Sequence, residues 1–222
     1  MFWGMLISTM GSSMIWPFLM IYIKGRVNLP LSTVTLLTTI NALTGLVSAL
    51  IAGPITDRVG RKWVLVFSLA GNGLVYIFMS QASTLPAFAV LMGFSGIFNP
   101  MYRVSGDAMV ADLIPPAQRP DAYALLRLSN NAGIALGPSL GGALTLLSYT
   151  IAFFCAAGGL ICFGILMLFL AHETLPDRQS KSSFFTTFAG YGQVLRDRPF
   201  LSFVGTFILV QMSGVLMWVL LP

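Results

Sequence analysis

Two residues of opposite charge, Arg103 and Asp107, lie one helical turn apart in the middle of a long apolar run. On a helix this spacing allows the two side chains to form an ion pair. A charge inside a bilayer costs at least ~2.5–3.5 kcal/mol, so such residues generally bind a substrate or transfer a proton. We therefore predict that Asp107 is a protonatable carboxylate, although Arg103 favours its charged form. A permanent ion pair that only fixes helix packing is the alternative.

Other polar residues in this apolar run and in the next one are candidates for lining a cavity. Asn99 and Tyr102 precede Arg103 in the first run. The next run contains three more polar residues near the expected cytoplasmic mouth of the cavity: Arg127, Asn130 and Asn131. Either they contact an anionic group or they only hydrogen-bond to neighbouring helices. The residue types alone do not decide between these two roles.

A second cluster of charge separates two runs, 31–52 and 63–80, that contain no charged residue. Each run is about 20 residues long, enough to cross a ~30 Å hydrocarbon core as a helix. The cluster is therefore predicted to be a short turn, made tight by Gly53 and Gly60. Asp57 and Arg61 stand one helical turn apart and can pair. By the positive-inside rule the turn is cytoplasmic, because it holds three cations: Arg58, Arg61 and Lys62.

The pattern of this cluster, G-x-x-x-D-R-x-G-R-K, resembles the signature loop between helices 2 and 3 of the major facilitator superfamily. In that family the loop clamps the two halves of the transporter together in the outward-facing state. An acid at the end of helix 4 often pairs with the loop arginine. The resemblance thus implies a conformational switch formed by Gly53, Asp57, Arg58, Gly60, Arg61, Lys62 and Asp112. The alternative is an ordinary basic loop, with Asp112 as a solvated charge at a helix end.

Two patterns in the later helices extend the resemblance. The family commonly has R-x-x-x-G in helix 4, linked to proton coupling, but here Asp107 stands four positions after Arg103 and the glycine is Gly106. The run G-x-x-x-G-P-x-x-G-G resembles the antiporter motif of drug and metabolite exporters. Stacked glycines permit close helix packing and proline kinks a helix. The implied gating helix contains Gly133, Gly137, Pro138, Gly141 and Gly142. A glycine packing face that encodes no transport direction is the alternative.

The composition indicates which elements position these residues. Hydrophobic residues make up 56% of the 222 and charged residues 9%, which indicates an all-α polytopic membrane protein. The net charge of +5 would suggest nucleic acid in a soluble protein, but the cations gather in loops, so we expect no nucleic-acid partner. Cys155 and Cys162 are expected to be small packing residues. No metal-ligand spacing or cofactor motif is present, and a single histidine argues against an enzyme.

The apolar runs predict six membrane-spanning helices, a polar linker and the start of a seventh span. The spans are expected at 2–23, 31–52, 63–81, 86–113, 121–148 and 151–171. Within 172–199, aromatic and leucine residues recur every three or four positions, which predicts an amphipathic helix at the cytoplasmic interface. This order resembles one half of a superfamily transporter. It implies an N-terminal bundle over 1–171, a cytoplasmic linker over 172–199 and, over 200–222, an incomplete first helix of a missing C-terminal bundle.

The resemblance implies a secondary active transporter in the cell membrane, multi-pass and with a cytoplasmic N-terminus. Its expected function is proton-coupled export of a small, amphiphilic, drug-like solute by alternating access. Its partners would be that solute, protons, the lipid bilayer and the second bundle. One alternative is a symporter or facilitator that imports a sugar or another metabolite. The other is a membrane sensor or assembly protein, without transport, built on the same fold.

Overall fold

The computed structural model describes residues 2–175 and 196–220, and in the second range the side chains as far as Val210. It divides into two compact units, Met1–Asp177 and Arg178–Pro222, and each is described by itself. The amphipathic helix predicted within the linker lies outside the described residues.

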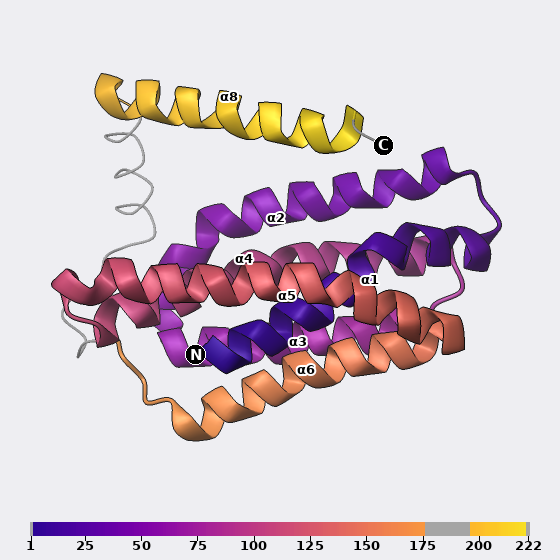
Figure 1. Cartoon of the computed structure of the whole chain (residues 1–222), viewed down its shortest axis with the longest axis horizontal. Coiled ribbons are helices and arrows are strands. Elements are labelled where there is room, and N and C mark those ends of the chain that lie inside the picture. The colour runs from indigo at the N-terminus through magenta and orange to yellow at the C-terminus, as the bar shows by residue number, and fades with distance from the viewer. Residues whose placement is uncertain (1, 176–195, 221–222) are drawn as a thin grey trace. The chain divides into compact units, whose positions relative to one another are not determined.

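The described part of the first unit is a bundle of long helices (Figure 1). The helices are α1 (Phe2–Val27), α2 (Leu31–Val59), α3 (Arg61–Gln81), α4 (Leu85–Leu113), the short 3-10 helix η1 (Pro116–Gln118), α5 (Arg119–Leu147) and α6 (Tyr149–Leu170). The second unit contains α8 (Arg198–Leu220), which begins close to the predicted position 200. The fold is therefore all-α over the described residues, as predicted.

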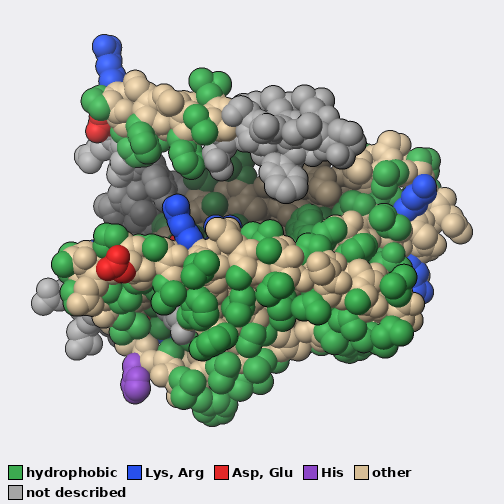
Figure 2. All heavy atoms as spheres, viewed as in Figure 1, with side chains coloured by type: hydrophobic (Ala, Val, Ile, Leu, Met, Phe, Trp, Pro, Cys, Tyr) green, Lys and Arg blue, Asp and Glu red, His purple; other side chains and the backbone are tan. Residues whose placement is uncertain are grey.

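Most of these helices have the length and composition of membrane spans. Among the described residues, α1, α2, α3, α4 and α6 are long and apolar enough to cross a bilayer. Helix α5 has 29 residues, the same length as α4, but its asparagines and glycines dilute its apolar content. Hydrophobic side chains cover much of the surface seen in Figure 2, as expected where helices face lipid. The chain is a multi-pass membrane protein.

The helix ends differ from the prediction mainly at the charge cluster that includes Asp57, Arg58, Arg61 and Lys62. Helix α2 does not end near Ala52 but continues through Gly53 to Val59. Gly60 alone separates it from α3, with a φ of 111° that only glycine adopts without strain. The expected ten-residue turn is thus a single residue, and Gly53 is a helical residue with open space beside it.

The core lies where α1, α3, α4 and α6 meet. Large side chains from all four helices are almost completely buried there, among them Ile23, Leu69, Phe88 and Leu160. Cys155 and Cys162, which were expected to be small packing residues, lie on the exposed face of α6 and are not part of the buried core. An apolar run of uniform hydropathy does not reveal which face of a helix turns inward.

Side chains on one helix also bond to the backbone of another. The Asn41 amide of α2 donates to the Met92 carbonyl of α4 at 2.9 Å. The Ser48 hydroxyl donates to the Ile97 carbonyl at 2.6 Å. At the end of the bundle where α1 and α3 both finish, the Tyr22 hydroxyl of α1 donates to the Ser80 carbonyl of α3 at 2.9 Å. Such bonds hold apolar helices in register where lipid supplies no hydrophobic driving force.

Candidate functional site

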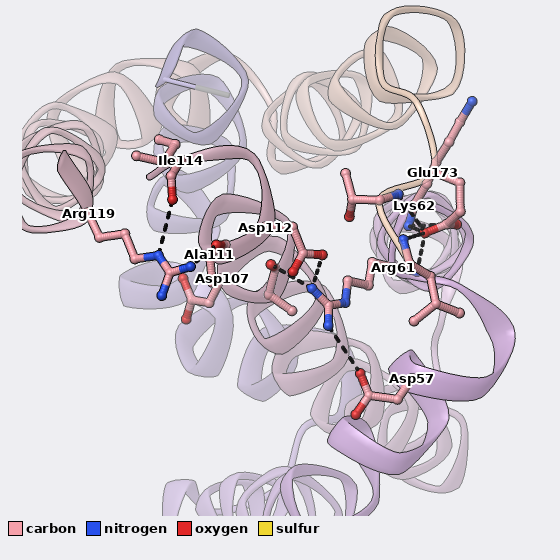
Figure 3. A network of polar contacts seen from close by, with 12 residues as sticks. Asp57, Arg61, Lys62, Asp107, Ala111, Asp112, Ile114, Arg119 and Glu173 are labelled. Atoms are coloured by element: carbon pink, nitrogen blue, oxygen red, sulfur yellow. Dashed lines mark hydrogen bonds and ion pairs between the residues drawn. The ribbon is translucent and has the colours of Figure 1, made fainter. Parts of the chain in front are cut away.

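Arg61, the first residue of α3, joins three helices at one end of the bundle (Figure 3). Its guanidinium forms an ion pair with Asp112 in the last turn of α4. Its Nη2 also lies 3.6 Å from Oδ1 of Asp57 in the last turn of α2. The Arg61 side chain is 16% exposed and that of Asp57 is 64% exposed, so the group is open to solvent on one side. The sequence predicted this set of three residues; their role as a conformational switch stays a prediction.

The backbone at the start of α3 is capped by a residue that the sequence prediction did not include. Gly60 has no side chain to cap the helix, and the first N–H groups of a helix have no partner within it. The Glu173 carboxylate, just beyond α6, accepts the N–H of Arg61 at 2.9 Å and that of Lys62 at 3.2 Å. A negative charge at this end also complements the helix dipole. A Cβ on Gly60 would collide with Oε2 of Glu173.

Arg61, Asp57 and Asp112 together are called the Arg61 hub below. The remaining residues of the predicted switch lie around it. Arg58 is exposed at the end of α2. The Lys62 ammonium lies 5.7 Å from the centre of the Trp63 ring, within reach of a cation–π contact. Gly53 borders a hollow of about 480 Å³ that Asp57, Arg61 and Asp112 also line. Sequence reasoning gave no role to Arg119, which donates to the Ala111 carbonyl at 2.6 Å and so satisfies the end of α4.

A separate cavity of about 410 Å³ lies within the bundle. Its polar side is formed by α4 and α5. It includes five of the residues predicted to line a cavity, Tyr102, Arg103, Asp107, Arg127 and Asn130, together with Tyr123. Its apolar side comes from four helices, α1, α3, α5 and α6, through Met5, Leu65, Leu126 and Phe163. The cavity therefore has charged and apolar walls.

A second hollow, of about 540 Å³, shares Arg103 and Asp107 with this cavity. Asn99, also predicted as a lining residue, borders this second hollow together with Trp16. Asn131 is exposed and lines neither space. Of the two neighbouring asparagines in the prediction, Asn130 and not Asn131 lines the first cavity, because one position along a helix turns a side chain by about 100°. Asn130 faces inward instead and accepts a hydrogen bond from the Thr9 hydroxyl at 3.2 Å.

Arg103 and Asp107 do not form the predicted ion pair. Among the described side chains, the ion pairs found within 4.0 Å all involve Arg61. Both Arg103 and Asp107 are exposed to the two spaces that they line, where solvation competes with a weak pair. The hydroxyl of Tyr123 on α5 donates to the backbone carbonyl of Asp107 at 3.2 Å, which links α5 to this turn of α4.

Helices α1 and α5 approach each other closely along the glycine face of α5. Gly133, Gly137 and Gly141 are buried. A Cβ on Gly137 would lie 2.8 Å from the Met10 carbonyl oxygen, and one on Gly141 would lie 2.8 Å from the Met14 Cα. The structure thus shows the close packing that the glycine spacing predicts. Gly142 does not belong to this face, since its Cβ would meet only the Phe18 ring, at an ordinary 3.5 Å.

Comparison with known proteins identifies relatives of this architecture. The family model described as Major Facilitator Superfamily matches residues 1–222. A Na(+), Li(+), K(+)/H(+) antiporter of Planococcus maritimus is 28% identical over 208 residues, which are 86% of this chain and 48% of the relative. The class H tetracycline resistance protein of Pasteurella multocida is 28% identical over 183 residues, 77% of this chain and 44% of the relative.

A solved structure shows the same fold. The crystal structure of the human organic anion transporter MFSD10 (TETRAN) matches with a TM-score of 0.63 and 22% identity, and the match covers 79% of this chain and 47% of that one. The chain spans about half the length of the curated relatives that it matches. From the family match over all its residues, the chain belongs to the Major Facilitator Superfamily.

Proposed function

We propose that the protein is a secondary active transporter that exports a small, amphiphilic solute in exchange for protons. The observation that carries this proposal is the cavity of about 410 Å³ with an ionisable carboxylate, Asp107, on a wall that faces apolar side chains. Its volume lies within the ~300–1,000 Å³ typical of sites for small molecules. An intramembrane carboxylate is the usual carrier of a coupling proton. The similarity to a cation/proton antiporter and to a tetracycline resistance protein supports exchange and export.

Alternating access requires this bundle to rock against a second one around the cavity. In our proposal the Arg61 hub, with Asp57 and Asp112, stabilises one of the two end states. Its position at the joined ends of α2, α3 and α4 supports that role, since a movement of any of these helices would change its ion pairs. Asp57 is the most exposed member and so is the one best placed to change partner.

The proposed gating element is α5. Its three buried glycines bring its backbone against that of α1, so the two helices move as a pair. Pro138 lies between two of these glycines and removes one backbone donor, which favours a bend at that level.

We also propose that the hub lies on the cytoplasmic side of the cell membrane, with the N-terminus on the same side. The hub end of the bundle contains Arg58, Arg61, Lys62 and Arg119. The other end of the bundle contains Lys24 and Arg26, in the last turn of α1. An excess of cations at the hub end agrees with the positive-inside rule.

The similarity to the Planococcus maritimus antiporter favours a second candidate, the exchange of an alkali cation for protons. Carboxylate oxygens suit such hard cations. Against this candidate, Asp107 shares its cavity with two arginines, which repel a bare cation.

Transport by everted membrane vesicles with an acidified lumen would test the proposal. Addition of tetracycline, or of Na⁺, Li⁺ or K⁺, is expected to release protons from the lumen if that solute is exchanged, as reported by a pH-sensitive dye. Asp107→Asn should abolish the release, whereas Asp121→Asn, the same change in the first turn of α5 and outside the cavity, should not. Solute flux without proton movement would refute proton exchange.

A further inference from the structure

We propose that the transported solute is a zwitterion: a compact apolar body with one cationic and one anionic group. In the cavity, Asp107 would bind the cationic group, and Arg103 and Arg127 would bind the anionic group. This inference rests on the proposed exchange of solute for protons and adds the chemical class of the solute.

The first step concerns the charges of the cavity. Its charged lining residues are Arg103 and Asp107 from α4 and Arg127 from α5. Within the part of the chain that the structure describes, none of the three has an ion-pair partner within 4.0 Å. The two guanidinium groups cannot lose their protons. The wall thus presents charges of both signs to the cavity, and a solute that brings both signs of charge can pair with each of them.

The second step concerns the direction of coupling. A proton and a cationic group compete for the Asp107 carboxylate, so the binding of one releases the other, and the two are exchanged. A solute with only an anionic group behaves in the opposite way. It binds best when Asp107 is protonated, because the cavity then has two positive charges and no negative one, and it would move together with the proton.

A solute with only a cationic group is no better match. It would be exchanged for the proton, but it would have to lie beside Arg103 and Arg127, and like charges at short range repel each other. Among simple charge types, a zwitterion alone satisfies both conditions: its anionic group pairs with the arginines, and its cationic group competes with the proton for Asp107.

The third step concerns shape. Arg103 and Asp107 are separated by one turn of α4, a rise of about 6 Å. A solute that contacts both therefore has its two charges about one aromatic ring apart. Apolar lining residues such as Leu126 and Phe163 would contact the body of the solute, and the rings of Tyr102 and Tyr123 would lie beside its cationic group.

Four compounds on one benzene ring would test the inference. 4-(Aminomethyl)benzoate is zwitterionic, 4-methylbenzoate is anionic, 4-methylbenzylammonium is cationic and 4-methylbenzamide is neutral. Binding of each to the purified protein in detergent would be measured by equilibrium dialysis. The zwitterion should bind most tightly, and it should release lumenal protons from everted vesicles.

Three variants identify the groups responsible. Arg127→Gln and Asp107→Asn should each weaken binding of the zwitterion by about tenfold or more, as expected for loss of a charge-assisted contact. Lys24→Gln is the matched control: it removes one charge about 28 Å along α1 from the cavity residue Met5, at 1.5 Å per residue. It should leave binding unchanged. Arg127→Lys keeps the charge and should retain part of the affinity, which separates loss of the contact from misfolding.

The outcomes separate this inference from the proposed function. Equal binding of the cation and the zwitterion, or binding that Arg127→Gln leaves unchanged, would overturn the inference while proton exchange with another solute stands. Failure of all four compounds to bind would also overturn it. Tight binding of the zwitterion, lost in both variants but without proton movement in vesicles, would support the ligand class and refute proton exchange.

Discussion

The close approach of α5 to α1 predicts that substitution by alanine affects stability differently at the adjacent residues Gly141 and Gly142. A Cβ on Gly141 would overlap the Met14 carbonyl oxygen and lie 2.8 Å from its Cα and 2.9 Å from its carbonyl carbon. These are backbone atoms of α1, which cannot rotate away as a side chain does. The helices must therefore separate in Gly141→Ala. In Gly142→Ala the new methyl group meets only the end of the Phe18 ring at 3.5 Å.

The expected difference follows from two opposing terms. Insertion of a methyl group into a filled contact costs about 1–3 kcal/mol. Replacement of glycine by alanine within a helix contributes about 1 kcal/mol of stability, at both positions alike. Gly142→Ala should therefore be neutral or stabilising by up to about 1 kcal/mol, and Gly141→Ala should be less stable than Gly142→Ala by about 1–3 kcal/mol. For a chain of this size, that difference corresponds to a shift in Tm of about 2–12 °C.

Thermal unfolding of the purified protein in detergent, followed by tryptophan fluorescence, would measure this difference. Gly158→Ala on α6 is a second control, because nothing lies within 4 Å of its added Cβ. A Gly141→Ala protein that melts at or above the temperature of Gly142→Ala would refute the packing argument. If Gly141→Ala also lowers the rate of transport more than the loss of folded protein explains, the gating role of α5 gains support.

Three further substitutions test other parts of the bundle. Asp57→Asn should abolish solute-driven proton movement in vesicles while membrane insertion stays intact; normal transport would remove the proposed clamp role of the hub. Glu173→Gln keeps an acceptor oxygen but removes the charge at the start of α3, so Tm should fall by about 1–4 °C, from about 0.3–1 kcal/mol; an unchanged Tm would contradict the capping argument. Asn72→Leu should raise Tm, because both polar atoms of this fully buried side chain have no partner among the described residues and an unpaired polar group costs about 1–3 kcal/mol. A lower Tm would show that Asn72 makes stabilising hydrogen bonds.

The sequence predicted the helices well because a membrane span has a simple physical signature, about 20 apolar residues. It failed at the helix ends, where that signature no longer applies. Gly53 and Pro54 both disfavour helix, yet α2 continues past them to Val59. The ion pairs of Arg61 with Asp57 and Asp112 hold these helix ends together. Tertiary contacts thus outweigh local propensity at this point.

For the candidate site, spacing within one helix predicted which residues share a region but not which way each side chain points. Arg103 and Asp107 both line the cavity but do not form an ion pair within 4.0 Å. Asn130 rather than Asn131 faces inward, and a single sequence offers no marker for that choice. Glu173 was missed because its partners, the first N–H groups of α3, lie 112 positions earlier in the chain. The useful signal in the sequence is that α3 starts directly after Gly60, which has no side chain to cap it. Such a helix needs an acceptor from elsewhere in the chain for its first N–H groups.

The Glu173 cap on α3 also has a consequence for the synthesis and folding of the protein. Ribosomes add about 5–20 residues per second. The Ala108 carbonyl that accepts from Arg61 is 47 positions later in the chain, so it emerges about 2–9 s after the arginine. Glu173 is 112 positions later and emerges only after about 6–22 s, when α6 has been made. During that interval the first N–H groups of α3, next to its junction with α2, lack the Glu173 carboxylate as an acceptor. They gain it only after α6 has been synthesised.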